Sequence, residues 1–354
     1  MRQFAINEIG PVSSMASLSV KPNTKTLGRL TIAKSIVGSP IEMPFAIIRG
    51  ARDGPKIWVQ GVIHGDEFVG SETVRRIIND LDPETLSGTL IGIPIVSTTA
   101  YAAHMRYSSI DHKDFDFSFT NNPSGTFTER FSHLLLREIT SMLSAEDFMF
   151  DLHGSPGGTI MQPWVDYHAI GGKSEERSRA AAEATGMRVV YKITPRKDYK
   201  EEIGMSTTFA DEYLPNSSAM QILKRVKLGR LVIEAGSTVV RNEDVIVQYS
   251  GVLNVMKHLG MLRGSPTKPA GKRVYVNHAR RVMAKNTGFW RPVAVPGNMV
   301  SKGEVLAVVT DEYGRKTEEA ISPVDGILLI NKPNSFVDPL SYVLGHRYGA
   351  LVAY

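Results

Sequence analysis

Apolar residues follow two patterns along the chain, and the two patterns alternate. Continuous apolar runs, typical of buried strands, occupy residues 41–50, 57–63, 89–96, 148–153 and 230–236. Apolar residues at helical spacing occupy 68–81, 131–143, 174–185 and 245–259, and each of these stretches predicts a helix. Strands that alternate with helices in this way predict an α/β domain with a largely parallel sheet flanked by helices.

Local signals predict several ends of these elements. Thr126-Phe127-Thr128-Glu129 matches a capping box and predicts a helix start. Gly186 and Gly260 predict helix ends, and residues 52–55 predict the turn after the strand at 41–50. Polar residues fill 106–125, which we expect to form a loop, and the weakly periodic segment 194–220 is expected to form loops over the functional site.

The pattern changes after residues 264–271, whose Gly, Pro and Ser content is typical of a linker. Short strand-like runs broken by Gly and Pro follow at 288–295, 305–310 and 326–330. We therefore expect two domains: an α/β domain over residues 1–265 and a small all-β C-terminal domain over residues 266–354.

The composition narrows the chemistry that is open to the chain. Its 354 residues are 42% hydrophobic and 22% charged, as in an ordinary globular protein with a sizeable core. The chain contains no cysteine. Disulfides and thiolate metal sites are therefore excluded, and any metal must be held by His, Asp or Glu.

The charge distribution and the lack of long apolar runs argue against nucleic-acid and membrane partners. The net charge is +5, but Lys and Arg are interspersed with acids, as in 195–202, which favours a solvated surface over a nucleic-acid interface. Residues 1–8 lack the apolar core of a signal peptide, and no run approaches the roughly 18 apolar residues of a membrane helix. We expect a soluble, cytoplasmic protein with no nucleic-acid or membrane partner.

Two of the strand-like runs lead into histidines. His64-Gly65-Asp66-Glu67 follows the run at 57–63, and the run at 148–153 ends in His153. Since ligands gather at the carboxyl ends of strands in parallel sheets, we expect His64, Glu67 and His153 to meet at one site. A lone His-x-x-Glu pair often arises by chance, so the second, distant histidine is what favours a metal. Two imidazoles and a carboxylate suit a hydrolytic zinc ion that keeps one position open for water.

Three more residues have candidate roles beside such a metal. Glu234 ends an apolar run and is a candidate general base, and Arg106 is a candidate to stabilise an oxyanion. Asp151 precedes His153 by two residues, so on a regular strand it points to the same side and is a candidate acceptor for a ligand histidine. Each also has a structural alternative: a cap or loop carboxylate for Glu234 and Asp151, and a surface ion pair for Arg106.

Longer motifs around these residues resemble the succinylglutamate desuccinylase/aspartoacylase family, relatives of the zinc carboxypeptidases. His64-Gly65-Asp66-Glu67 resembles the first zinc motif of the family, and Asp151-Leu152-His153-Gly154 resembles the motif with the third ligand. Glu234-Ala235-Gly236 resembles the segment that carries the general base. Met105-Arg106-Tyr107 is similar to the segment whose arginine polarises the scissile carbonyl, and residues 300–306 are similar to the family's β-rich domain.

This resemblance covers most of the chain, and it implies a fold, a cofactor and an assembly. The implied fold is a zinc carboxypeptidase-like mixed, largely parallel sheet with a small C-terminal all-β domain. The implied cofactor is one Zn(2+) per subunit, held by His64, Glu67 and His153, and the implied assembly is a homo-oligomer. Manganese, cobalt and nickel also suit this ligand set.

One segment departs from the family pattern. The family often carries Asp-x-Asn-Arg-x-Phe, whose Asn-Arg pair grips a substrate carboxylate, whereas this chain reads Asp114-Phe115-Asp116-Phe117-Ser118-Phe119. A phenyl ring cannot make the bidentate bond that an arginine makes to a carboxylate. We hypothesise that Asp116 binds an ammonium or neutral group of the substrate, as in an N-acetylated diamino acid; the alternative is that Asp116 caps a loop.

The sequence therefore predicts a zinc-dependent amide hydrolase that removes an acyl group from a small N-acyl amino acid or amine. Glu234 would move protons and Arg106 would stabilise the tetrahedral oxyanion. Two alternatives stay open: a carboxypeptidase-like hydrolase, and a catalytically silent metal-binding or ligand-binding protein.

Overall fold

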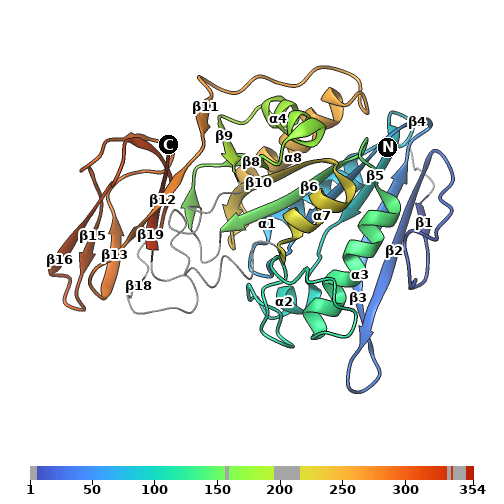
Figure 1. Ribbon diagram of the computed structural model, residues 1–354, viewed down its shortest axis with the longest axis horizontal. Helices are drawn as coiled ribbons and strands as arrows, with labels where there is room; N and C mark the ends of the chain where they lie inside the picture. The colour runs from blue at the N-terminus through green and yellow to red at the C-terminus, as the bar shows by residue number, and fades with distance from the viewer. Residues whose placement is uncertain (1–5, 156–158, 195–215, 333–335, 338–347) are drawn as a thin grey trace.

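A mixed sheet of ten strands organises the larger part of the protein, as seen in a computed structural model that describes residues 6–155, 159–194, 216–332, 336–337 and 348–354 (Figure 1). In sheet order the strands are β1 (Ile6–Glu8), β2 (Thr24–Lys34), β3 (Pro40–Arg49), β5 (Ser87–Ile93), β4 (Arg52–Gly61), β6 (Phe148–Ser155), β10 (Gly229–Ser237), β8 (Trp164–His168), β9 (Val189–Ile193) and β11 (Val274–Val276). Neighbours are parallel except for β2–β3, β3–β5 and β10–β8. The predicted α/β class with a largely parallel sheet is confirmed.

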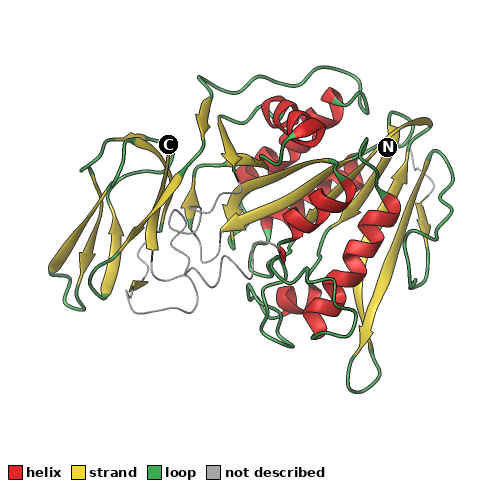
Figure 2. Ribbon diagram, in the orientation of Figure 1, coloured by secondary structure: helices red, strands yellow, loops and turns green. Residues whose placement is uncertain are grey.

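Helices cover both faces of this sheet (Figure 2). On one face lie α1 (Val69–Asp80), α4 (Gly172–Ala184) and α8 (Asn242–His258), which share a hydrophobic core with strands β4, β6 and β10. On the other face lie α3 (Phe127–Met142) and α7 (Ser218–Val226), which share a second core with the same sheet. The short helix α2 (Thr98–Ala102) follows β5.

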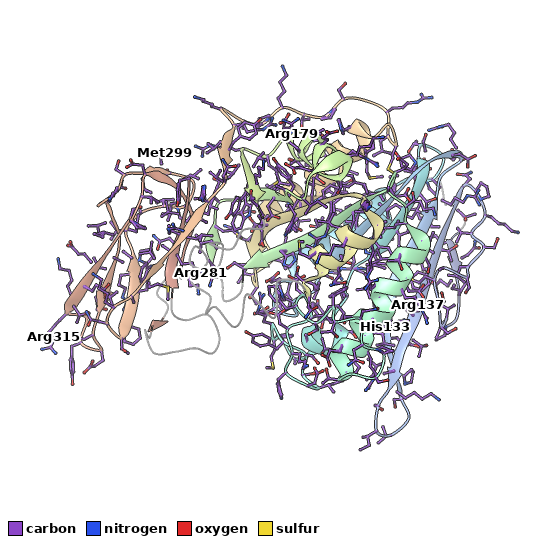
Figure 3. All side chains as sticks on the ribbon, in the orientation of Figure 1. His133, Arg137, Arg179, Arg281, Met299 and Arg315 are labelled. Atoms are coloured by element: carbon purple, nitrogen blue, oxygen red, sulfur yellow. The ribbon has the colours of Figure 1, made fainter. Side chains whose placement is uncertain are left out.

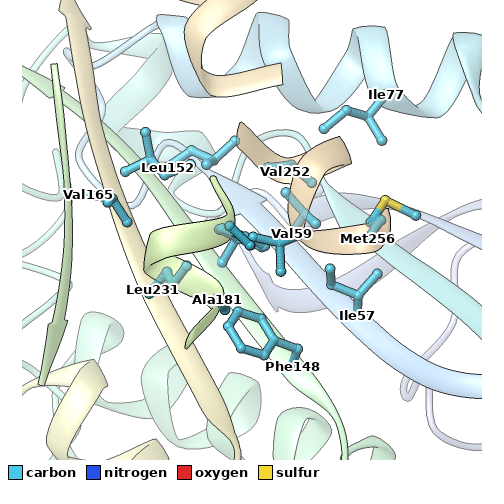
Figure 4. Packing of buried hydrophobic residues seen from close by; sticks show 14 of the residues in the cluster. Ile57, Val59, Ile77, Phe148, Leu152, Val165, Ala181, Leu231, Val252 and Met256 are labelled. Carbon is cyan, nitrogen blue, oxygen red and sulfur yellow. The ribbon is translucent and has the colours of Figure 1, made fainter. Parts of the chain in front are cut away.

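Successive side chains of the central strands point to opposite faces and so enter different cores. Ile57 and Val59 of β4 pack with α1 and α8, where Val252 and Met256 meet them (Figure 4). Trp58, between the two, packs on the α3 and α7 side. The polar side chains of the site lie on the face that Trp58 shares, at the carboxyl ends of β4, β6 and β10.

The C-terminal part is built from two smaller antiparallel sheets. One contains β12 (Ala279–Met283), β19 (Tyr348–Ala353), β17 (Gly326–Asn331) and β14 (Met299–Val300), and β7 (Ile160–Met161) also pairs with β17. The other contains β16 (Lys316–Ile321), β15 (Val305–Thr310), β13 (Gly288–Pro292) and β18 (Phe336–Val337). The predicted strands at 305–310 and 326–330 are confirmed in these sheets, and the strand predicted at 288–295 is present but ends at Pro292.

Strand pairing and a shared hydrophobic cluster connect the large sheet to the C-terminal part. Strand β11 follows the predicted linker yet still pairs with β9 of the large sheet, whereas β7, which precedes the linker, pairs with β17 of a smaller sheet. Buried residues from both parts form one cluster, which includes Trp164 and Tyr191 from the large sheet and Ile327 and Leu329 from β17. The boundary at residue 265 stays a prediction. The labelled arginines Arg137, Arg179, Arg281 and Arg315 lie on separate parts of the molecule (Figure 3).

Most predicted elements agree with the structure, and several observed elements were not predicted, among them β2, β8, β9 and α2. The predicted turn at 52–55 is wrong: these residues already belong to β4, and the chain turns at Gly50 and Ala51. Helix α7 was not predicted, since it lies at the end of the weakly periodic segment 194–220. The loops predicted at 195–215 lie outside the described residues. In the part of the chain that the structure describes, no helix is long and apolar enough to cross a membrane.

Candidate metal centre and active site

The turn after β4 brings His64 and Glu67 to the site. Val62 has a φ of 58°, which is rare for a β-branched residue, and hydrogen bonds from the backbone N–H of Ser97 and Val96 hold this turn. Gly65 follows, and a Cβ atom built on it would lie 2.1 Å from the carbonyl carbon of Ala100 in α2. Only glycine fits this close approach, which explains the residue between the two predicted ligands.

His153 comes to the same place from strand β6. Its backbone carbonyl accepts a hydrogen bond of 2.7 Å from Nε2 of Gln248, so helix α8 holds it from the far face. Nδ1 of His64 lies 2.9 Å from Oε1 of Glu67, and Nδ1 of His153 lies 3.0 Å from Oε2 of Glu67. We call these three residues the metal triad. They are buried, and one ligand atom from each lies within 4.8 Å of the others.

Two further carboxylates lie beside the histidines of the metal triad. Each histidine turns Nδ1 toward Glu67 and Nε2 toward another carboxylate: Asp114 at 3.3 Å from His64, and Asp151 at 3.5 Å from His153. Histidines that bind metal commonly present their second nitrogen to a carboxylate, which fixes the orientation of the ring. The triad could therefore hold a metal ion, with donors that suit zinc and several other divalent ions.

Mutual charges set the protonation of the triad. Burial raises the pKa of the Glu67 carboxyl, but the imidazoles of His64 and His153 outweigh it and lower this pKa well below its usual value. Burial and Arg106 lower the pKa of His64, but Glu67 and Asp114 outweigh them and raise it to about 9. The Glu67 carboxylate is thus charged at neutral pH, and a metal ion bound at the triad would take the place of the protons on the two imidazoles.

Arg106 lies beside the triad, as its predicted role requires. Nε donates to Oδ2 of Asp114 at 3.0 Å, while Nη1 lies 3.4 Å from Oε1 of Glu67 and 3.2 Å from Nδ1 of His64. Although burial lowers the pKa of the guanidinium, Asp114 and Glu67 raise it above its usual range. Arg106 is therefore a fixed positive charge, held by Asp114 at the edge of the site.

Glu234 lies on β10 directly beside His153. The two residues are register partners of the parallel pair β6–β10, so their side chains leave the sheet on the same face. Burial raises the pKa of the Glu234 carboxyl to about 8, and the charge of Glu67 adds to this, against the opposite effect of His153. A carboxyl group with a pKa near neutrality can both accept and donate a proton at physiological pH.

Asp116 contacts another part of the chain. Its Oδ1 accepts a short hydrogen bond from Oγ of Ser218, and its carbonyl accepts one of 2.7 Å from the Ser218 N–H. These bonds join the loop at 106–125 to the first turn of α7. The backbone N–H of Asp116 donates to Oδ1 of Asp114 at 3.1 Å. The same oxygen lies 3.3 Å from Nε2 of His64, so Asp114 connects Asp116 to the metal triad.

Two polar residues of this region were missed by sequence reasoning. Asp114 was seen only as part of the divergent segment, and its pairing with His64 and Arg106 depends on the three-dimensional path of the loop. Arg230 opens the predicted strand at 230–236, and its Nη2 donates to Oδ2 of Asp151 at 2.8 Å. A charged residue within a run of buried apolar residues was the signal that could have identified it.

The chain is similar in sequence to known proteins. The model of the succinylglutamate desuccinylase/aspartoacylase catalytic domain matches residues 53–259. The chain is 23% identical over 290 residues to the N-alpha-acetyl-L-2,4-diaminobutyric acid deacetylase of Halomonas elongata, covering 80% of this chain and 78% of that protein.

Solved structures share the fold along nearly the whole chain. The succinylglutamate desuccinylase/aspartoacylase from Rhodobacter sphaeroides superimposes with a TM-score of 0.76 at 23% identity, covering 95% of this chain and 97% of that chain. The product-bound ectoine utilization protein EutE (DoeB) from Ruegeria pomeroyi gives a TM-score of 0.77 at 19% identity, covering 95% and 96%. The match of the family model over more than half of its length shows that the chain belongs to the succinylglutamate desuccinylase/aspartoacylase family of amide hydrolases.

Proposed function

We propose that the protein is a zinc-dependent deacylase that removes an acyl group from a small N-acyl amino acid or amine. The observation that carries this proposal is the convergence of His64, Glu67 and His153 within 4.8 Å of one another, with Glu234 in register beside His153. The deacetylase named among the relatives of the chain supports hydrolysis of an N-acyl bond.

The metal triad would hold one zinc ion per subunit. Bound there, the ion supplies a Lewis acid for the scissile carbonyl and for the attacking water. The chain's own contribution is to keep the two imidazoles oriented through Asp114 and Asp151. Manganese, cobalt and nickel suit the same donors, so the identity of the ion is part of the proposal.

Glu234 and Arg106 are proposed to act in proton transfer and in oxyanion stabilisation, respectively. Glu234 takes a proton from the attacking water and passes it to the leaving amine, and its pKa of about 8 suits both transfers near neutral pH. Arg106 stabilises the negative charge that develops on the carbonyl oxygen, because Asp114 fixes its guanidinium beside the triad.

Asp116 is proposed to favour a substrate that places an ammonium or neutral group near the loop at 106–125. An N-acetylated diamino acid meets this requirement, and the name of the Halomonas elongata relative supports the choice. The contact with Ser218 supports the alternative role, in which Asp116 only caps a loop. Turnover of acetylated diaminobutyrate and of N-acetylaspartate, measured in the wild type and in Asp116→Asn, distinguishes the substrate-binding role from the capping role. A wild type that prefers N-acetylaspartate would contradict the substrate-binding role.

The central experiment is elemental analysis of the purified protein, followed by a screen of N-acyl amino acids. We expect one zinc ion per chain and hydrolysis of at least one acyl amide. Glu234→Gln should lower kcat by at least about a hundredfold while the zinc content stays unchanged. Glu146→Gln, on an exposed loop, is the matched control and should leave kcat unchanged. Loss of zinc from Glu234→Gln would mean that Glu234 is a ligand and not the base.

The same screen distinguishes the alternatives. A carboxypeptidase-like hydrolase would cleave C-terminal residues from peptides faster than it cleaves N-acyl amino acids. A silent binding protein would bind zinc and ligand without turnover. A homo-oligomeric assembly stays a prediction, which light scattering can test.

A further inference from the structure

A cavity of about 950 Å³ lies at the end of the large sheet opposite the metal triad. Its walls come from residues that precede β6, follow β8, begin α4 and end α7. His153 and Glu234 lie toward the carboxyl ends of β6 and β10, whereas the cavity lies at the amino ends of the same two strands. The cavity is therefore separate from the candidate active site, and it has the size of an ordinary ligand pocket.

Basic side chains dominate the charged part of the cavity lining. Lys173 and Arg177 come from α4, and Lys224 and Lys227 come from the end of α7. The acid among the described lining residues is Glu146, which pairs with Arg177 at 3.4 Å. Among the described residues, the three lysines form no ion pair and no side-chain hydrogen bond. Their ammonium groups are therefore open to an anion from solution.

The position of Lys173 is not explained by its own helix. Lys173 lies in the first turn of α4, at the positive end of the helix dipole, where a cation is unfavourable. Lys224 lies in the last turn of α7, so the dipole of that helix alone can account for it. Because lysines of both helices line one cavity, their ammonium groups repel one another. An anion bound between them would offset this repulsion.

The remainder of the lining is largely apolar. Ile170, Met220 and Leu223 present side chains without polar groups to the cavity. Gly171 and Gly172 have φ values of 80° and 66°, and a Cβ atom built on either would meet no atom within 4 Å. The chain thus leaves open space beside the start of α4. A ligand that fits this lining carries negative charge in one part and an apolar group in another.

We propose that this cavity binds a nucleotide, with its phosphates among Lys173, Lys224 and Lys227 and its base on Ile170 and Met220. Lysine ammonium groups bind phosphate as point charges on flexible stems. The base would remove the apolar part of the lining from water. An inorganic anion would leave that part exposed, so the lining favours a phosphate that carries an apolar group. The site does not depend on the proposed deacylase function.

Calorimetry with ATP on chelator-treated, dialysed protein is the first test. ATP is the probe because the apolar side chains of the lining have no polar group that would select one base. We expect ATP to bind, and tripolyphosphate and adenosine to bind at least about tenfold more weakly, since each keeps only part of the contacts. Failure of ATP to bind, or equal affinity for either fragment, would overturn the proposal.

A triple variant then assigns the binding to the lysines. It combines Lys173→Gln, Lys224→Gln and Lys227→Gln, and it should bind ATP at least about tenfold more weakly than the wild type. The matched control makes the same change in net charge at three exposed lysines outside the cavity lining: Lys21→Gln, Lys34→Gln and Lys302→Gln. This control should bind ATP as the wild type does. Equal weakening in the two triple variants would mean that ATP responds only to net charge, and the proposal would be wrong.

Photolabelling locates the site in the wild-type protein. An azido derivative of ATP should modify residues within 145–146, 169–177 or 220–227, and excess ATP should prevent this. Labelling confined to other segments, such as the turn at 62–67 beside the metal triad, would contradict the proposal. A wild type that binds ATP at this cavity but hydrolyses no N-acyl substrate would disprove the deacylase function and leave the nucleotide site standing.

Discussion

Oδ2 of Asp151 lies 3.5 Å from Nε2 of His153, because the two residues are two positions apart on β6 and share one face of the strand. The same oxygen accepts the hydrogen bond of 2.8 Å from Arg230. Asp151 is fully buried, and although burial raises the pKa of its carboxyl, His153 and Arg230 lower it below the usual value. Asp151 is therefore a fixed anion that orients the histidine ring.

Replacing this anion should weaken metal binding. Asp151→Asn keeps the shape of the side chain but removes the charge that His153 faces, so we expect a 10- to 100-fold loss of zinc affinity. Competition with a chromogenic chelator measures this loss. Asp147→Asn is the control, since Asp147 is also buried but bonds to the N–H groups of Lys56 and Ser144. Unchanged zinc affinity in Asp151→Asn would show that the orientation of His153 does not depend on this carboxylate.

The close approach of Gly65 to α2 makes a second prediction. In Gly65→Ala the new methyl group would meet the backbone of Ala100 at 2.1 Å, so the turn that carries His64 and Glu67 must move. We expect a loss of about 1–3 kcal/mol in unfolding free energy and a lower zinc content. Gly10→Ala is the matched control, because a Cβ atom at Gly10 has no neighbour within 4 Å. Full zinc occupancy in Gly65→Ala would be the contrary result.

Arg106 should affect the rate and leave binding nearly unchanged. Arg106→Lys keeps a positive charge but cannot bond to Asp114 while it also faces the triad, so we expect kcat to fall about a hundredfold with a small change in KM. Arg130→Lys, whose arginine bonds to the carbonyl of Gly125, serves as the control. A rise in KM at unchanged kcat would assign Arg106 to substrate binding.

Asp166 should make stability depend on pH. Burial raises its pKa from 3.8 to about 7 in the folded protein, so the unfolded chain releases this proton at lower pH than the folded protein does. The stability associated with the protonated form is therefore present below pH 3.8 and is lost as pH rises through about 7.

Urea unfolding of chelator-treated protein at pH 4 and pH 8 tests this sign. Asp166→Asn cannot ionise, so its unfolding free energy relative to the wild type should rise between the two pH values by up to about 4 kcal/mol. Asp53→Asn, at a fully exposed position, should show no such change. A constant difference between Asp166→Asn and the wild type across this range would mean that Asp166 ionises with an ordinary pKa.

The sequence alone determined the elements and the ligand types. Continuous apolar runs predicted the central strands β4, β6 and β10, and apolar residues at helical spacing predicted helices α1, α3 and α8. These patterns arise because a strand buried on both faces is apolar throughout, whereas a helix buried on one face is apolar at every third or fourth residue. The absence of cysteine and the strand-end positions of His64 and His153 predicted a histidine and carboxylate site. These properties depend on residues close together in the chain.

Only the tertiary structure decided which distant residues meet. The pairing of β6 with β10 sets Glu234 beside His153, and the path of the loop at 106–125 brings Asp114 to His64 and Asp116 to Ser218. Arg230 shows the limit most clearly, since its partners come from a neighbouring strand and from a helix that the sequence pattern did not predict. Strand register and the path of a loop depend on packing between segments far apart in the chain, so the pattern of residues within one segment does not predict them.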